Sequence, residues 1–383
     1  MKINIDYNKC LTNLASSISK YFGIEPFHNT LDSLDDALSS NPKNVVLILC
    51  DGMGYNILNR TLDKDSFLVS HIKEPISSVF PPTTTAATTS VMTGLNPNEH
   101  CWLGWEIYIK DVNNVVIMYQ NKIKDTDIHF DENICQKYMP YQTIMDRINK
   151  EGKYYAAYIS LYGDIGYEDF HDMCNKIKQN LNKKDRNYIY AYYENPDTYM
   201  HLYGADSKEV VEEINMINFE LERLCNGLED TLVIIIADHG HMKQRIVYLE
   251  DYPELFECLE RTTSIDSRSA MYFIKDGMSD YFKDRFTKEF DDNFILLDRN
   301  QIFEYNLFGT GNNHPYFDSC IGDFISISNK NLSIKYKRKE GKVEAVSSHA
   351  GNTTDETEVP LVLVKKRWRL IFFIFIGDNF SFF

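Results

Sequence analysis

Short, unbroken apolar runs recur along the chain and constrain its fold more than any other feature of the sequence. Runs of about four to eight apolar residues bounded by turn-forming residues are typical of strands that are buried on both faces. We predict such strands at 45–50, 154–160, 188–193, 232–237 and 361–364. Helical patterns lie between the runs, most clearly at 208–224, where apolar side chains fall on one face. This alternation predicts an α/β fold in which a mainly parallel sheet is sandwiched by helices.

The pattern changes between residues 244 and 343. Short strand-like pieces at 270–274 and 324–328 stand there among aromatic and charged residues. No linker rich in Pro, Gly or Ser marks either end of this segment, so we interpret it as an inserted α+β cap and not as an independent module. Residues 1–243 and 344–383 then form one α/β core.

The charge balance limits the classes of partner. Lysine and arginine number 40 against 56 aspartate and glutamate residues, which gives a formal net charge of −16. This excess repels the phosphate backbones of nucleic acids and anionic lipid, so we expect no broad nucleic-acid-binding surface. A small anionic substrate is still allowed, because a local metal site reverses the sign of the field where the substrate binds.

Cysteine usage and the ends of the sequence bear on location. The eight cysteines are spread singly, without CxxC pairs, which is typical of free thiols in a reducing compartment. Residues 1–26 lack the continuous apolar stretch of a signal peptide, and we therefore expect a cytoplasmic protein. The most apolar segment, 370–376, is too short to span a bilayer of about 30 Å, so we expect no membrane span and predict a terminal strand or a packed tail there.

Three of the predicted strands lead into acidic residues. The strand at 45–50 is followed directly by Asp51, the strand at 232–237 by Asp238, and the strand at 188–193 by a turn that contains Asp197. A single aspartate after a strand is most often the start of a loop. Functional groups in such folds gather just past the carboxyl ends of the strands. Three carboxylates at one edge are therefore candidate ligands of a metal site.

Histidines accompany these carboxylates. His201 lies four residues after Asp197, so both side chains share one face if the segment is helical. His239 directly follows Asp238, and both side chains can converge on a metal where a strand ends in a turn. His349 lies in a Ser/Gly loop shortly before a predicted buried strand, which makes it the natural imidazole to complete the set.

Other side chains near these motifs each have two interpretations. We expect His241 to be exposed, with a supporting contact to the ligands as the alternative. We expect His314 to be a turn histidine, with reach towards the substrate as the alternative. Aromatic residues near the motifs, among them Tyr192 and Trp105, either stack on a nucleobase or pack the core, and packing is the default.

A threonine-rich segment offers a nucleophile. Residues 80–95 combine a proline-fixed entry, a cluster of hydroxyls and a helix that ends at Gly94. A hydroxyl at a helix N-terminus lies where backbone N–H groups and the helix dipole favour an anion. Without the acidic residues, the same segment is equally well explained as a threonine-rich helix cap. Since a threonine hydroxyl is a weak nucleophile at neutral pH, it requires a metal or a base, and the carboxylates and histidines supply a metal site.

Five motifs in order carry a resemblance to a known family. They are DGMG at 51, FPPTTTAATTSVMTGLNPNEH at 80, NPDTYMH at 195, ADHGH at 237 and SSHAG at 347. In these motifs the sequence resembles the alkaline phosphatase superfamily, and within it the nucleotide pyrophosphatase/phosphodiesterase-like branch. The resemblance implies an alkaline phosphatase-like core. It also implies a two-metal phosphodiesterase or nucleotide pyrophosphatase-type hydrolase that acts on small phosphate esters through a phosphothreonine intermediate.

The resemblance further implies roles for individual residues. Members of the family bind two divalent ions, usually zinc. Matching the threonine-rich motif without gaps places the nucleophile at Thr84 and not at Thr85. The ligands of one ion would then be Asp51, Thr84, Asp238 and His239. The ligands of the other would be Asp197, His201 and His349.

One departure from the family's pattern concerns the substrate. The position where many pyrophosphatases place a phosphate-binding asparagine falls on Trp105. The resemblance implies a small phosphate-bearing substrate such as a nucleotide. Two alternatives stay open: a phosphomonoesterase or phosphonate hydrolase on the same scaffold, and a catalytically silent metal-binding relative. The complete ligand set argues against the silent relative.

Overall fold

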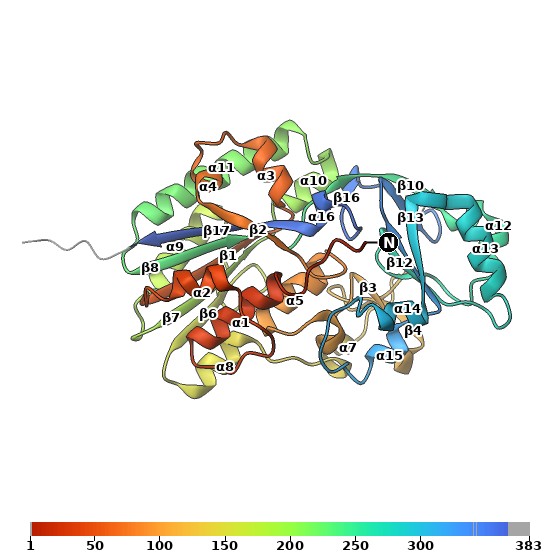
Figure 1. Cartoon of the computed structure of the whole chain (residues 1–383), viewed down its shortest axis with the longest axis horizontal. Coiled ribbons are helices and arrows are strands. Elements are labelled where there is room, and N and C mark those ends of the chain that lie inside the picture. The colour runs from red at the N-terminus through yellow and green to blue at the C-terminus, as the bar shows by residue number, and fades with distance from the viewer. Residues whose placement is uncertain (1, 340, 342, 367–383) are drawn as a thin grey trace, which may run out of the picture.

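Two large sheets organise the molecule, and in the computed structural model they lie side by side (Figure 1). The structure describes residues 2–339, 341 and 343–366. The apolar tail at 370–376, for which we predicted a terminal strand or a packed tail, falls outside the described residues.

The first sheet contains the strands predicted from the apolar runs. Its order is β2 (Ile72–Ser77), β17 (Glu358–Lys366), β8 (Thr231–Ile236), β1 (Asn44–Cys50), β7 (Asn187–Tyr193) and β6 (Tyr155–Ile159). β8, β1, β7 and β6 are parallel, whereas β17 enters between β2 and β8 and is antiparallel to both. The predicted mainly parallel sheet is therefore confirmed.

The register aligns the carboxyl ends of three strands. Cys50 at the end of β1 pairs with Tyr193 at the end of β7, and Leu49 pairs with Ile236 at the end of β8. Every residue of β1 is buried, as expected of a strand covered on both faces. The loops that follow β1, β7 and β8 consequently meet at one edge of the sheet.

Two layers of helices sandwich the first sheet (Figure 1). One layer contains α1 (Leu11–Tyr21), α2 (Asp32–Leu38), α5 (Thr84–Thr93) and α8 (Ile144–Glu151). The other contains α3 (Tyr55–Thr61), α4 (Phe67–Ser70), α9 (Phe170–Asn180) and α11 (Lys208–Asn226). α11 matches the predicted helix: Ser207 Oγ accepts a hydrogen bond from Val210 N, and one apolar face is buried against the core.

The second sheet is antiparallel. Its order is β13 (Phe294–Asp298), β14 (Phe324–Ser328), β12 (Ser269–Tyr272), β11 (Ser264–Ile265), β3 (Glu106–Ile109), β4 (Asn114–Ile117) and β5 (Lys122–Ile123). This sheet and the helices beside it form what we call the second lobe. Its helices are α7 (Ile134–Tyr138), α12 (Pro253–Phe256), α13 (Ser279–Phe290), α14 (Arg299–Glu304) and α15 (Phe317–Cys320). A small parallel pair, β10 (Arg245–Tyr248) with β15 (Leu332–Lys335), adds to it.

The second sheet draws on two distant parts of the chain. β3, β4 and β5 lie outside 244–343, yet Ile265 of β11 pairs with Glu106 of β3. Ile107 and Val116 are buried in the same apolar cluster as Ile325 of β14. Without β3 the edge of β11 would present unpaired backbone groups. The boundaries 244–343 stay a prediction, and the sheet at the centre of the predicted cap also takes strands from residues 106–123.

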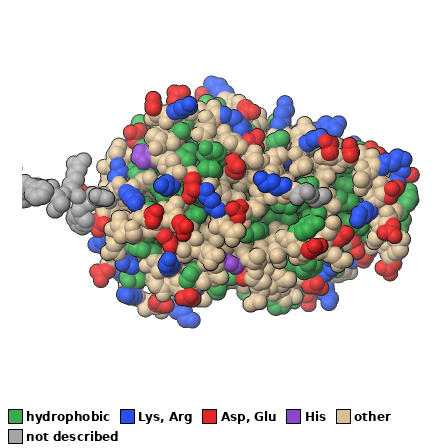
Figure 2. All heavy atoms as spheres, in the orientation of Figure 1, with side chains coloured by type: hydrophobic (Ala, Val, Ile, Leu, Met, Phe, Trp, Pro, Cys, Tyr) green, Lys and Arg blue, Asp and Glu red, His purple; other side chains and the backbone are tan. Residues whose placement is uncertain are grey.

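The surface and the cysteines agree with the composition. Side chains of both charges are interspersed over the face shown in Figure 2. All eight cysteines are free and buried. No helix in the described part of the chain is both long and apolar enough to cross a membrane. The cytoplasmic location stays a prediction.

Candidate metal centre and nucleophile

Three loops at the carboxyl edge of the first sheet bring the predicted carboxylates together. Asp51 follows β1, Asp238 follows β8, and Asp197 begins α10 (Asp197–Tyr203), which comes after β7. The backbone N–H of Asp197 donates to the carbonyl of Asp51 at 3.1 Å. Gly52 N donates to Asp238 Oδ1 at 3.1 Å. The loops are therefore held together by their own hydrogen bonds.

Two glycines allow this close approach. A Cβ atom at Gly54 would lie 2.5 Å from the Cα of Gly240, and one at Gly240 would lie 2.0 Å from the carbonyl oxygen of Asp355. Backbone meets backbone at both points, so a side chain would push the loops apart. This explains the glycines of the DGMG and ADHGH motifs in physical terms.

Thr84 is the first residue of α5, directly after its N-cap residue Thr83. The helix ends at Gly94, whose φ of +77° stops it in the left-handed conformation, as the sequence predicts. Thr84 is 9% exposed, and its Oγ1 lies 3.2 Å from His239 Nε2. Thr85 is fully buried, and its Oγ1 has no hydrogen-bond partner among the described residues. The structure thus places Thr84, and not its neighbour, against the histidine of the predicted ligand set.

The first predicted ligand group surrounds His239. Its Nε2 lies 3.3 Å from Asp51 Oδ1 and 3.5 Å from Asp238 Oδ2. These two carboxylate oxygens are buried and have no hydrogen-bond donor in the described part of the chain. Buried acceptors without a donor are rare because their desolvation is costly. A cation between these oxygens and the imidazole would satisfy them.

The second predicted group surrounds Asp197. Its Oδ1 lies 3.5 Å from His201 Nε2 and 3.9 Å from His349 Nε2. A third imidazole is closer, since His241 Nε2 lies 2.5 Å from the same oxygen. His241 directly precedes β9 (Met242–Lys243) and His349 directly follows β16 (Ser347–Ser348), and these two strands pair antiparallel. That pairing brings the two rings to the same place.

Backbone carbonyls fix the orientation of the three predicted histidines. His239 Nδ1 donates to Gly240 O at 3.1 Å, His201 Nδ1 donates to Ser347 O at 2.9 Å, and His349 Nδ1 donates to Pro82 O at 3.3 Å. Because a carbonyl can only accept, each Nδ1 carries the proton and each Nε2 presents a lone pair. Metal-binding histidines are typically held in this way by an acceptor on the other nitrogen.

The distances between side-chain nitrogen and oxygen atoms distinguish the ligands of one ion from a hydrogen-bond partner. Two ligands of one tetrahedral zinc ion, each bound at about 2.0–2.1 Å, lie about 3.3 Å apart. The distances from His239 Nε2 to its predicted co-ligands and from Asp197 Oδ1 to His201 Nε2 are of this size, and His349 Nε2 is farther from Asp197 Oδ1, at 3.9 Å. The 2.5 Å between His241 Nε2 and Asp197 Oδ1 is too short for two ligands of one ion, and it fits a charge-assisted hydrogen bond. His241 therefore orients Asp197.

The expectation that His241 is exposed is wrong. It is 1% exposed and lies in the cluster with Asp197, His201 and His349. The misplaced expectation has a physical origin, because the contact depends on the pairing of β9 with β16, which is more than a hundred residues away in sequence. The HxH spacing of His239 and His241 was the available signal, since side chains two apart on extended backbone point to one face.

The pKa values reflect three carboxylates packed into one buried place. Burial, followed by the neighbouring carboxylates of Asp238 and Asp197, raises the pKa of Asp51 well above its ordinary value. Burial also raises the pKa of Asp238. Burial opposes ionisation of Asp197, but the imidazoles of His201 and His241 hold its pKa well below the ordinary value. Burial lowers the pKa of His241 to about 4. Imidazole nitrogens beside crowded carboxylates form a donor set that suits zinc.

Some aromatic residues have functional contacts that the sequence did not reveal. The hydroxyl of Tyr192 donates to Asp51 Oδ2 at 2.5 Å, so this residue supports a predicted ligand. Trp105 is 37% exposed and contacts the ring of Tyr119, whose hydroxyl shares a hydrogen bond with Thr88 one helical turn beyond Thr84. His314 lies in a turn, as predicted, where its Nδ1 accepts from Tyr316 N.

Comparison with known proteins agrees with this arrangement. A family model described as type I phosphodiesterase / nucleotide pyrophosphatase matches residues 45–352. None of the curated protein sequences matches the chain significantly.

Solved structures show a similar fold. Murine ectonucleotide pyrophosphatase / phosphodiesterase 5 has a TM-score of 0.62 and 16% identity, with 84% of this chain and 88% of that chain covered. The human protein of the same name has a TM-score of 0.61 and 17% identity, with 85% and 91% covered. Phosphonoacetate hydrolase from Sinorhizobium meliloti 1021, in complex with phosphonoformate, has a TM-score of 0.60 and 15% identity, with 86% and 92% covered. At such identities the likeness concerns the fold.

Proposed function

The chain belongs to the type I phosphodiesterase / nucleotide pyrophosphatase family and is a phosphoester hydrolase, and we propose that it uses Thr84 as nucleophile together with two divalent ions, preferentially zinc. One observation carries the proposal. Three imidazoles, of which those of His239 and His349 are buried and that of His201 is half-buried, each donate Nδ1–H to a backbone carbonyl and present Nε2 to a carboxylate. Such an arrangement is suited to binding cations, because cation binding requires several lone pairs in fixed positions.

The distances support a division of the residues between two ions. One ion is assigned to Asp51, Thr84, Asp238 and His239. The other is assigned to Asp197, His201 and His349, with His241 as the hydrogen-bond partner of Asp197. Three carboxylates and two divalent cations sum to about +1, so the site attracts an anionic phosphoryl group although the chain is acidic.

The residues of the chain have separate tasks in the proposed reaction. When bound, the ions would lower the pKa of the Thr84 hydroxyl and neutralise charge on the phosphoryl oxygens. Thr84 Oγ1 attacks phosphorus, the bond from phosphorus to the leaving oxygen breaks, and water then hydrolyses the phosphothreonine. The N-terminus of α5 directs its free N–H groups to the phosphoryl oxygens. Tyr192 and His241 hold Asp51 and Asp197 in orientation.

The proposed substrate is a small phosphodiester or pyrophosphate, such as a nucleotide. An inactive variant of the murine structural neighbour is described in complex with AMP. A phosphonate hydrolase or phosphomonoesterase is the second candidate, because phosphonoacetate hydrolase covers the chain about as well and because Trp105 stands where the family's pattern has a phosphate-binding asparagine.

Metal analysis with paired threonine variants tests the proposal. The zinc content of the purified chain is measured together with its turnover of a chromogenic phosphodiester, a chromogenic phosphomonoester and phosphonoacetate. We expect two ions per chain and a preference for the diester. Thr84→Ala should lower turnover by several orders of magnitude. Thr85→Ala is the matched control, because it removes the neighbouring buried hydroxyl in the same helix.

Each outcome bears on a different part of the proposal. Turnover that survives Thr84→Ala but is lost in Thr85→Ala would move the nucleophile by one residue. Metal-independent turnover that is unchanged in Thr84→Ala would refute the mechanism. A preference for the monoester or for phosphonoacetate would favour the second candidate and leave the metal assignment intact.

A further inference from the structure

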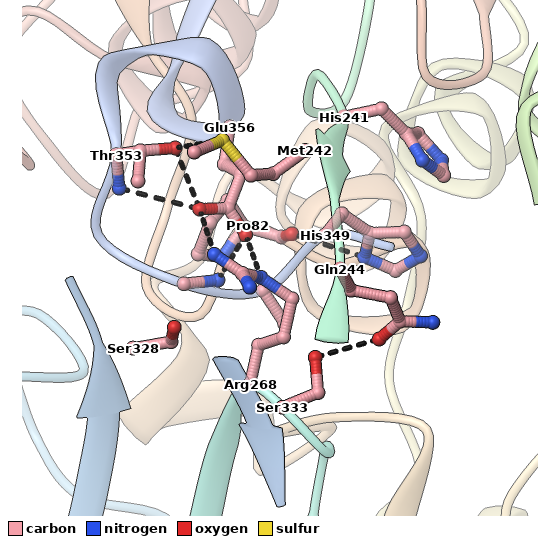
Figure 3. Close-up of polar contacts among 12 residues, drawn as sticks. Pro82, His241, Met242, Gln244, Arg268, Ser328, Ser333, His349, Thr353 and Glu356 are labelled. Carbon is pink, nitrogen blue, oxygen red and sulfur yellow. Dashed lines mark hydrogen bonds and ion pairs between the residues drawn. The ribbon is translucent and has the colours of Figure 1, made fainter. Parts of the chain in front are cut away.

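A buried ion pair joins the second sheet to the two loops that carry the histidines and Asp238. Arg268 lies between β11 and β12 and is fully buried, as is Glu356 of α16 (Thr354–Thr357). Arg268 Nε donates to Glu356 Oε1 at 2.6 Å and Nη2 donates to Oε2 at 2.8 Å. The guanidinium also donates to the carbonyls of Leu332 and Lys330, at 3.2 and 2.7 Å. Figure 3 shows this pair between the strands of the second lobe and the His349 segment.

Glu356 connects the ion pair to the backbone of two loops, the one that follows β16 and the one that follows β8. Its Oε1 accepts from Gly351 N at 2.7 Å, two residues after His349. Its backbone carbonyl accepts from Gly240 N at 3.0 Å, between His239 and His241. The ion pair packs directly on the loop backbone, since a Cβ at Gly351 would lie 2.7 Å from Glu356 Oε2 and 2.9 Å from Arg268 Nη2.

The neighbour of Arg268 holds the same loop at a second point. The hydroxyl of Ser269 donates to Ala350 O at 2.5 Å. Ala350 has a φ of +85°, a conformation that an alanine does not keep unless its surroundings impose it. Arg268 and Ser269 together therefore impose the backbone path that directs the His349 ring towards Pro82 O and Asp197.

We propose that Arg268 and Ser269 are positioning residues of the metal centre, so that the second lobe sets the affinity of the ion assigned to Asp197, His201 and His349. Arg268 acts through Glu356, and Ser269 acts through Ala350. Neither residue contacts a predicted ligand side chain. The inference rests on the proposed function only in requiring that the cluster binds divalent ions, and it holds for any substrate.

The test must separate positioning from a purely structural role. Removing one member of a buried pair is strongly destabilising because it leaves an uncompensated charge, so single variants are uninformative. The double variant Arg268→Met/Glu356→Gln removes both charges and keeps an acceptor for Gly351 N. The matched control is Lys124→Met/Glu106→Gln, which neutralises another shielded pair of the second lobe whose nitrogen and oxygen are 2.6 Å apart. Ser269→Ala is an independent and milder variant.

Zinc affinity is measured by chelator competition on folded protein, and the absorption spectrum of the cobalt-substituted protein reports ligand geometry. We expect one of two ions to bind at least about tenfold more weakly in the double variant, with a changed cobalt spectrum, and Ser269→Ala to shift the same ion in the same direction. The control pair should match the wild type in both measurements.

Several results would overturn the inference. Wild-type affinities and an unchanged spectrum in the folded double variant would make the pair purely structural. If the double variant does not fold, Ser269→Ala decides, and wild-type behaviour there rejects the positioning role. A wild-type protein that binds no divalent ion would refute the proposed function itself, whereas two ions bound equally by wild type and variants would refute only this inference.

Discussion

The carboxyl of Asp266 lies beside α5, and the structure gives the size of its expected effect on the free energy of unfolding. Asp266 Oδ2 accepts a hydrogen bond from Thr83 Oγ1 at 3.5 Å, next to Thr84. Burial, followed by the carboxylate of Glu106, raises the pKa of Asp266 from 3.8 to about 6. A folded-state pKa above the unfolded value means that the folded protein holds the proton more tightly. The stabilisation that this carboxyl contributes to the folded protein is therefore lost as pH rises from about 4 to about 6.

The magnitude follows from the shift. Roughly two pKa units correspond to about 3 kcal/mol, and partial exposure of the side chain reduces this to about 2 kcal/mol. Asp266→Asn lacks the titration. Relative to the wild type, its free energy of unfolding should therefore increase by about 2 kcal/mol as pH rises from 4 to 6, and the difference should stay constant at higher pH.

Urea unfolding of chelator-treated protein at intervals between pH 4 and pH 8 measures this difference. Asp284→Asn on the exposed side of α13 is the control, because this carboxylate is in solvent. The control measures the effect of replacing an exposed carboxylate by an amide. A difference between Asp266→Asn and wild type that does not exceed the control, or that decreases as pH rises, would refute the reasoning from burial.

Three further predictions concern the metal centre. Zinc affinity should rise with pH by up to about tenfold per unit, because the proton that the raised pKa of Asp51 retains must leave when a cation binds. Chelator competition measures this slope, and an equal slope in Asp51→Asn would contradict the explanation. Tyr192→Phe should weaken zinc binding about ten- to hundredfold in the same assay, since it removes the donor to Asp51, and unchanged affinity would argue against a supporting role. Ala350→Gly should raise the free energy of unfolding by about 1 kcal/mol in urea, because glycine adopts a φ of +85° without strain, and a loss of stability would show that alanine is not strained there.

The features that could be predicted are those written locally in the chain. β1 and β8 are unbroken apolar runs, and each leads directly or after one residue into an aspartate. Local sequence also specifies α5, because the threonine cluster begins it and Gly94 ends it. The fold class predicts that functional side chains gather at the carboxyl edge of the sheet. The meeting of Asp51, Asp197 and Asp238 could therefore be expected without coordinates.

The features that could not be predicted depend on contacts between distant segments. The direction of β17 cannot be read from its burial pattern, because the covered part of a strand is apolar whichever way the strand runs. β3 to β5 are short strands, and only their pairing with β11 assigns them to the second sheet. The role of His241 depends on the pairing of β9 with β16, and that of Arg268 depends on reaching a glutamate 88 residues away.

The place of β17 in the first sheet has a consequence for how the chain is synthesised. This strand follows all others of the sheet in the chain, yet it lies between β2 and β8. Until it has left the ribosome, β2 has no partner in this sheet and one edge of β8 exposes unpaired N–H and C=O groups. A nascent chain that forms the other strands of this sheet before β17 emerges would hold them as two separate parts, and a product truncated before residue 358 would present an aggregation-prone edge.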